Sequence, residues 1–114
     1  MLFRSILTSL GVNETPEKIK FLKAWRQAEG GHALNNPFNT TKNVEGDEDT
    51  DYNSVGVKNY PDRQTGLDAT VATLRLGYYT DLVNMLKNDD ITAEELAASP
   101  ALNTWGTKGG VARV

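Results

Sequence analysis

The chain has 114 residues, a formal net charge of −3 and no cysteine. This length is typical of one domain, so we expect residues 1–114 to bury a single core. Lys and Arg are scattered rather than gathered in a stripe, so nucleic acid is not an expected partner. The lack of cysteine excludes disulfides, thiolate metal sites and a cysteine nucleophile.

Residues 2–10 have the apolar spacing of a short amphipathic helix, and we expect residues 1–14 to form an N-terminal flap. Polar residues interrupt the apolar run and no small-residue cleavage site follows. We therefore predict no signal peptide and no membrane-spanning helix. Such a protein is made in the cytoplasm, and any action outside the cell requires release or delivery.

Thr15, Pro16 and Glu17 form a strong helix start, because Thr caps, Pro fits the first helical position and Glu complements the dipole. The sequence predicts a helix from Pro16 to Glu29, ended by Gly30-Gly31, since Gly accepts the left-handed conformation at helix ends. Its predicted core face consists of Ile19, Leu22, Trp25 and Ala28, widened by Phe21 and Ala24.

From Ala33 to Pro61 the chain becomes rich in Asn, Gly, Asp and Pro. Short β-like runs at Phe38–Thr41 and Val55–Tyr60 flank the acidic loop Glu45–Asp51. We predict a small, irregular hairpin.

The second half of the chain has a helical pattern. Thr65–Asp68 has the form of a capping box, and apolar residues follow at steps of three or four as far as Met85. Gly77 is expected to split this segment near Tyr78 and Tyr79. A second box at Thr92–Glu95 starts a short helix that stops at Ser99-Pro100, and residues 103–114 form a tail in which little beyond Trp105 can pack. The predicted fold class is mainly α (α+β), a helical core with a small irregular β-hairpin.

Glu29 is the strongest candidate for catalysis. It falls on the last turn of its helix, four residues after Trp25, at the edge of the apolar stripe. Partial burial and the negative end of the helix dipole both favour the protonated carboxyl, so we expect a raised pKa suited to a general acid. The alternative is a Glu that merely ends a helix.

Metal, serine-hydrolase and nucleotide chemistry are not expected. The only histidine, His32, lacks the further ligands of a metal site and is interpreted as a polar cleft residue. Asp47, Asp49 and Asp51 mimic the start of a calcium loop, but Tyr52 and Lys58 replace its required Gly and Glu. The sequence has no Gly-x-Ser-x-Gly elbow and no phosphate-binding Gly loop. We predict no cofactor.

Groups that suit sugars gather in the segments expected beside Glu29. They are amides, hydroxyls and aromatic rings: Asn35, Asn36, Asn39, Thr40, Thr41, Asn59, Tyr60 and Tyr79. Turn-forming Asn and core Tyr explain each residue singly, so only the combination indicates a glycan site.

The order of these pieces resembles peptidoglycan hydrolases of the lysozyme-like superfamily, closest to glucosaminidase and soluble lytic transglycosylase domains and to short phage tail or lysis proteins. The resemblance rests on WRQAEGGHALNNPFNTT, on GVKNYPDRQTGLDATVATL and on a later Tyr, and it covers residues 25–86. It implies a lysozyme-like helical core, with the hairpin beside an active-site cleft, and cleavage of cell-wall glycan.

By this resemblance Glu29 is the proton donor, and Asn36 to Thr41 form the turn and strand that line the cleft. Tyr60 takes the place of an aromatic residue that contacts substrate or orients the Glu, and Tyr79 that of the Tyr between the last two core helices. The predicted substrate-binding set consists of these two with His32, Asn36, Asn39, Thr40 and Thr41. Members with a full lysozyme mechanism use a second carboxylate, for which Asp51 is the candidate. Without one, the resemblance to transglycosylases implies attack by the substrate's own 6-hydroxyl.

Two other classes of function remain open from the sequence. One is a non-catalytic lysozyme-like module that binds glycan or forms part of a virion, with other virion proteins as partners. The other is an unrelated helical interaction domain.

Overall fold

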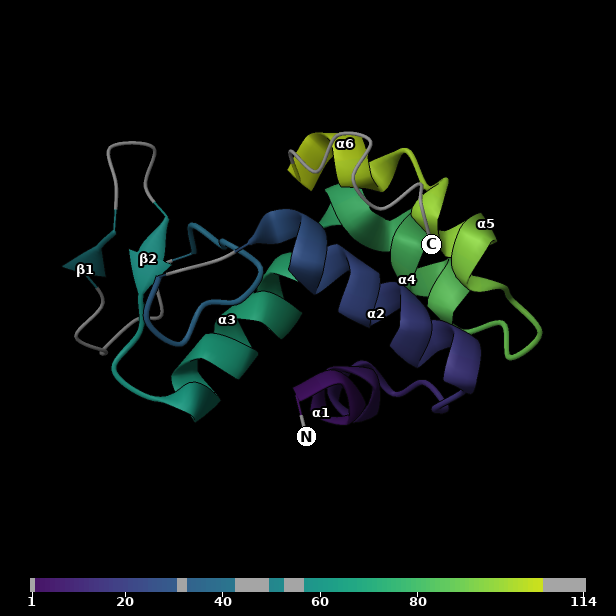
Figure 1. The fold of residues 1–114 in the computed structure, drawn as a ribbon, viewed down its shortest axis with the longest axis horizontal. Helices are drawn as coiled ribbons and strands as arrows, with labels where there is room; N and C mark the ends of the chain where they lie inside the picture. Colours follow the sequence, from purple (N-terminus) through teal and green to yellow (C-terminus); the bar gives the residue numbers. More distant parts are fainter. Residues whose placement is uncertain (1, 31–32, 43–49, 53–56, 106–114) are drawn as a thin grey trace.

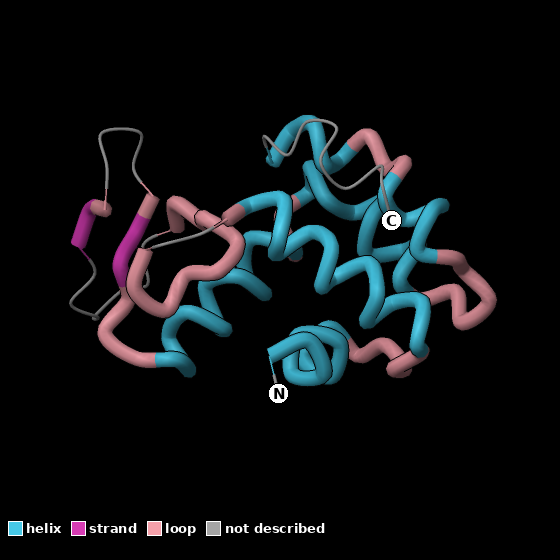
Figure 2. Tube along the Cα trace, in the orientation of Figure 1, coloured by secondary structure: helices cyan, strands magenta, loops and turns pink. Residues whose placement is uncertain are grey.

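The computed structural model describes residues 2–30, 33–42, 50–52 and 57–105, and the fold is mainly helical, as predicted (Figures 1 and 2). In chain order its elements are α1 Leu2–Leu10, α2 Pro16–Glu29, β1 Thr50–Asp51, β2 Lys58–Asn59, α3 Arg63–Leu74, the 3₁₀ turn η1 Gly77–Tyr79, α4 Thr80–Leu86, α5 Ala93–Ala97 and α6 Ala101–Trp105. None of the helices in these described ranges is long and apolar enough to cross a membrane.

Helix α2 runs through the middle of the molecule, with α1 on one side and α4 to α6 on the other (Figure 1). Its ends confirm the predicted signals. The Thr15 hydroxyl accepts a hydrogen bond from Lys18 N at 3.2 Å, and Pro16 takes the first helical position. Gly30 ends the helix with a φ of 56°, a left-handed conformation that glycine adopts without strain.

The buried face of α2 differs from the predicted one. It consists of Lys18, Phe21, Leu22 and Trp25, whereas Ala28 is exposed. The direction of the face is set by the helices that pack on it, α1 and α5, and these contacts are not encoded within α2 itself.

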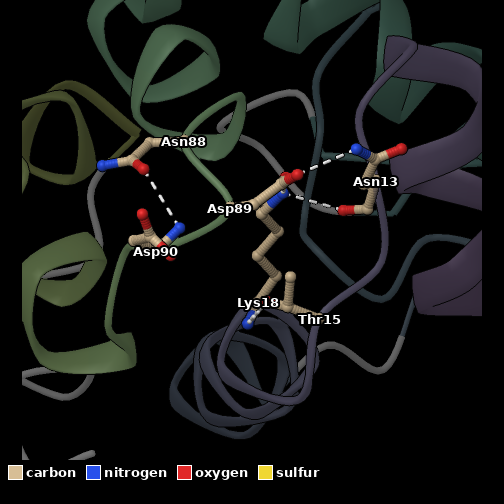
Figure 3. A network of polar contacts seen from close by, with 6 residues as sticks. All are labelled: Asn13, Thr15, Lys18, Asn88, Asp89 and Asp90. Atoms are coloured by element: carbon tan, nitrogen blue, oxygen red, sulfur yellow. Dashed lines mark hydrogen bonds and ion pairs between the residues drawn. The ribbon is translucent and has the colours of Figure 1, made fainter.

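A lysine inside the core is a consequence of this packing. The Lys18 side chain is fully buried, and its Nζ donates hydrogen bonds to Asn13 O and to Asp89 Oδ1, both at 2.8 Å (Figure 3). Asn13 Nδ2 donates to the other Asp89 oxygen at 2.9 Å (Figure 3). The network ties α2 to the turn between α4 and α5 and satisfies a charge that would otherwise be costly to bury.

Both ends of the described chain pack on the core. In α1, Ile6, Leu7 and Leu10 are buried in the same hydrophobic cluster as α2, α4 and α5. Near the other end, the Trp105 ring packs edge-on against Trp25 with centroids 4.9 Å apart. Residues 106–114 of the predicted tail lie outside the described residues.

Within the described residues, the hairpin uses a different first strand from the predicted one. β1 pairs antiparallel with β2, with Thr50 opposite Asn59 and Asp51 opposite Lys58. The predicted strand Phe38–Thr41 is instead an irregular loop, because Asn39 has a φ of 57°, which breaks a strand. Residues 45–49 of the predicted acidic loop and 55–56 of the predicted second strand lie outside the described residues.

The start of α3 also corrects the prediction. Asp62, not Thr65, is the N-cap, and its carboxylate accepts from Thr65 N at 2.7 Å. The expected break at Gly77 is confirmed by η1, which separates α3 from α4. The second capping box, between Thr92 and Glu95, is present as predicted.

Candidate functional site

Glu29 is the last residue of α2, and its half-buried carboxylate is held by two N–H donors. The Trp25 indole Nε1, one helical turn earlier, donates to Oε2 at 3.2 Å. Asn39 Nδ2 donates to Oε1 at 3.0 Å and also to the Glu29 backbone carbonyl at 3.0 Å. The carboxylate is thus fixed from its own helix and from the following loop.

The loop conformation brings Asn39 to this position. Asn35 and Asn39 both have left-handed backbones, with φ of 54° and 57°, a conformation that Asn tolerates better than most residues. Trp105 Nε1 donates to the carbonyl of Phe38 at 2.7 Å, immediately before Asn39. The C-terminal helix therefore fixes the loop that holds Glu29.

Asn36 supports the same loop from inside. Its Nδ2 donates to Thr40 O at 2.9 Å and to Lys58 O at 2.7 Å, and its Oδ1 accepts from Thr40 N at 2.9 Å. The amide thus closes the turn from 36 to 40 and ties it to β2. Backbone N–H and C=O groups that are buried here gain the partners they need.

A pair of buried hydroxyls extends this support. Thr40 Oγ1 and Tyr60 Oη lie 2.6 Å apart, and Tyr60 Oη donates to Lys42 O at 2.6 Å. Because Tyr60 has one hydroxyl proton, which goes to the carbonyl, Thr40 is the donor in the bond between the two hydroxyls.

These contacts change the interpretation of three predicted substrate-binding residues. Asn36, Thr40 and Tyr60 are 1%, 2% and 1% exposed, so their polar atoms face other parts of the protein. We assign them to positioning the loop, because their side chains are almost fully buried and bond to other parts of the protein. Of the other predicted contacts in this loop, Thr41 is exposed and Asn39 is half-buried.

Tyr79 is also buried, among the core aromatic residues. Burial raises the pKa of its hydroxyl above the usual value, and the neighbouring Tyr78 adds to the shift. Its ring lies 5.1 Å from that of Trp105, so it supports α6 rather than presenting a face to solvent.

An exposed aromatic residue that the sequence reasoning missed lies next to it. Tyr78 is 75% exposed and its ring centroid is 6.3 Å from that of Tyr79. A row of rings therefore runs from Trp25 through Trp105 and Tyr79 to Tyr78. The Tyr pair at the Gly77 break was the available signal, but periodicity could not tell which ring is buried.

The structure does not describe the side chains of two further predicted site residues. His32 lies outside the described residues, and for Asp51 the backbone is described, in β1, while the side chain is not. Asp51 as a second carboxylate therefore stays a prediction. Within the described ranges, no group of three or more His, Cys, Asp or Glu side chains could hold a metal ion.

The sequence matches no protein-family model, and no curated protein or solved structure matches it significantly. The candidate site therefore rests on the residues and geometry of this chain.

Proposed function

We propose that the protein is a lysozyme-like domain that cleaves the glycan strands of bacterial peptidoglycan, with Glu29 as the general acid. The observation that carries the proposal is the fixed Glu29 carboxylate at the end of α2, oriented by Trp25 and Asn39. A general acid must be held within hydrogen-bond reach of the oxygen it protonates, and such positioning contributes much of the rate.

In the proposed reaction the Glu29 proton passes to the glycosidic oxygen while the bond from that oxygen to the anomeric carbon breaks. Positive charge develops at the anomeric carbon, as in other glycosidases. Water then bonds to the anomeric carbon, or the 6-hydroxyl of the same sugar does so and forms an anhydro product. In either case the attacking oxygen gives up one proton, which restores the acid.

The surroundings of Glu29 suggest how a sugar chain is held. Thr41 is exposed and Asn39 half-exposed on the loop after α2, and both carry groups that bond sugar hydroxyls. At the far end of the row of rings that begins at Trp25, Tyr78 offers an exposed ring of the kind on which sugar faces pack. In the hydrolytic version, Asp51 is the second carboxylate.

The setting of the reaction follows from the substrate. Peptidoglycan lies outside the cytoplasm, so the protein acts on the wall after release from the cell or as part of a phage particle with other virion proteins. No cofactor is required for this chemistry.

The test is incubation of purified peptidoglycan with the protein, with Glu29→Gln and with Glu94→Gln, followed by mass spectrometry of the released fragments. Glu94 is an exposed glutamate on α5, far along the chain from the site, and serves as the matched control. We expect Glu29→Gln to lose roughly 100-fold to 10,000-fold in rate and the control to lose nothing.

The products separate the versions of the mechanism. Reducing ends indicate hydrolysis and name the bond that is cut, whereas anhydro-muramic ends indicate a transglycosylase. A Glu29→Gln variant as active as the parent removes Glu29 from the mechanism. Binding of peptidoglycan without release of fragments by any of the three proteins would replace the enzyme by a non-catalytic glycan-binding module.

A further inference from the structure

A pocket separate from the Glu29 carboxylate opens between the start of α1, the α2 surface, the 33–37 loop and the start of α3. In Figure 1, α1 and α3 lie on the same side of α2, opposite α4 to α6. The volume of the pocket is about 520 Å³, and Glu29 is not among the described residues that line it. Pockets that enclose small organic ligands commonly have volumes of about 300–1,000 Å³.

The charge of this pocket is opposite to that of the protein. Lys23 and Arg26 of α2 and Arg63 of α3 line it, and no Asp or Glu does so among the described residues. The whole chain, in contrast, has a net charge of −3. A concave surface with charges of one sign focuses its field and attracts ions of the other sign.

The three cations are available to a ligand. All are exposed, and within the described part of the chain no ion pair or side-chain hydrogen bond involves any of them. Arg4 and Lys18, by contrast, form ion pairs with Glu14 and Asp89. Guanidinium groups without a protein carboxylate suit phosphate and carboxylate ligands.

Beside the cations, the pocket has three amide side chains, those of Gln27, Asn35 and Asn36, and an apolar wall. Leu2 and Phe3 of α1 and Leu67 of α3 contribute to it, and each is only partly buried against the core. Pro37 and Ala33 continue this wall on the loop. A ligand that placed only a charge here would leave the apolar surface in water, so an apolar group beside the charge gains free energy from its burial.

We propose that this pocket binds a small anion that carries an apolar body about the size of one aromatic ring, with a phosphate or a carboxylate as the charged group. The cations bind the anionic group and the wall of Leu2, Phe3 and Leu67 packs on the ring. The site does not depend on Glu29 or on the proposed glycan cleavage.

The test is a titration of the full chain with phenyl phosphate and with 3-phenylpropionate, followed by calorimetry and by NMR shifts of backbone amides. Inorganic phosphate and benzyl alcohol are the controls that carry only the charge or only the ring. We expect the aryl anions to bind with dissociation constants on the order of 1 mM at low ionic strength. Both controls should bind about tenfold more weakly.

Substitutions locate the site. Lys23→Gln, Arg26→Gln and Arg63→Gln should each weaken binding of the aryl anion by about threefold to tenfold. Lys20→Gln removes the same charge from an exposed position of α2 that does not line the pocket, and it should leave binding unchanged. The amides that shift should be those of residues 33–37 and 63–67.

Four results overturn the proposal. The first is that neither aryl anion binds at about 20 mM, and the second is that benzyl alcohol binds as tightly as phenyl phosphate. The third is that Lys20→Gln weakens binding of the aryl anion as much as the substitutions in the pocket do. The fourth is that the amide shifts are confined to other parts of the protein. A preference for either aryl anion supports the site, and its direction names the charged group that the site recognises.

Discussion

Gly66 is the position at which a single methyl group should do the most damage. It is buried in the first turns of α3, where the helix passes close to the 33–37 loop. A Cβ on Gly66 would overlap the carbonyl oxygen of Asn35 and lie 3.0 Å from its carbonyl carbon. Gly66→Ala therefore forces two backbones apart.

Neither backbone is free to move. Gly66 N bonds to Asp62 O at 3.2 Å, and its carbonyl accepts from the Thr70 hydroxyl at 2.9 Å. On the other side, Asn35 Nδ2 donates to Tyr60 O at 2.9 Å, which fixes the loop against the hairpin. We place the cost at the upper end of the overpacking range, about 3 kcal/mol. For a chain of this length that lowers the Tm by about 12 °C.

Thermal unfolding followed by circular dichroism measures this effect. Gly77→Ala is the matched control, since a Cβ there meets nothing within 4 Å and its φ is not positive. It should change stability by less than about 1 kcal/mol. If Gly66→Ala melts within about 2 °C of the parent, the loop and helix do not make the close approach on which the reasoning depends.

Three further predictions concern contacts that the sequence did not indicate. Trp105→Phe keeps an aromatic ring but removes the hydrogen bond to Phe38 O, so it should cost about 1 kcal/mol in urea unfolding. Because Phe38 precedes Asn39, the substitution should also slow the proposed glycan cleavage. Unchanged stability and rate would show that α6 does not support the site. Lys18→Met should change stability by no more than about 1 kcal/mol, because it removes a buried charge and the Asp89 carboxylate that loses its partner is 52% exposed and stays in water. Asp89→Asn should destabilise the protein at neutral pH, because hydrogen bonds from Lys18 and then Asn13 hold the pKa of the Asp89 carboxyl below its usual value. A carboxyl whose pKa is lower in the folded than in the unfolded protein stabilises the fold above the unfolded pKa, and this contribution is lost as the pH falls through the folded pKa. The stabilities of the parent and of Asp89→Asn should therefore converge in acid. A difference in stability that stays constant from neutral pH to acid would contradict the lowered pKa of Asp89.

Local sequence signals predicted most helix ends correctly, because the hydrogen bonds that cap a helix join residues within one turn of each other. Thr15, Gly30 and the Thr92–Glu95 box act as predicted, because a cap depends on residues three or four positions away. The same logic selected Thr65 instead of Asp62 at the start of α3. Both residue types cap well, so local chemistry could not separate two candidates three positions apart.

Burial was harder to predict, because it depends on segments far apart in the chain. Lys18 was not expected in the core, and its partner Asp89 is 71 positions away. Tyr60 was predicted to contact substrate, but the polar partners of its hydroxyl lie inside the 36–42 loop. A polar residue gives the same sequence signal whether its partner is a ligand or the protein itself.

The sequence by itself placed Glu29 at the end of a helix, one turn after Trp25 and before a glycine that stops the helix, since these features depend on neighbouring residues alone. Only the tertiary structure determined what holds the carboxylate. Asn39 reaches it through a left-handed backbone, and the loop that carries Asn39 is fixed by Trp105, 67 positions beyond Phe38. Contacts over such separations depend on how the helices pack, which no local pattern encodes.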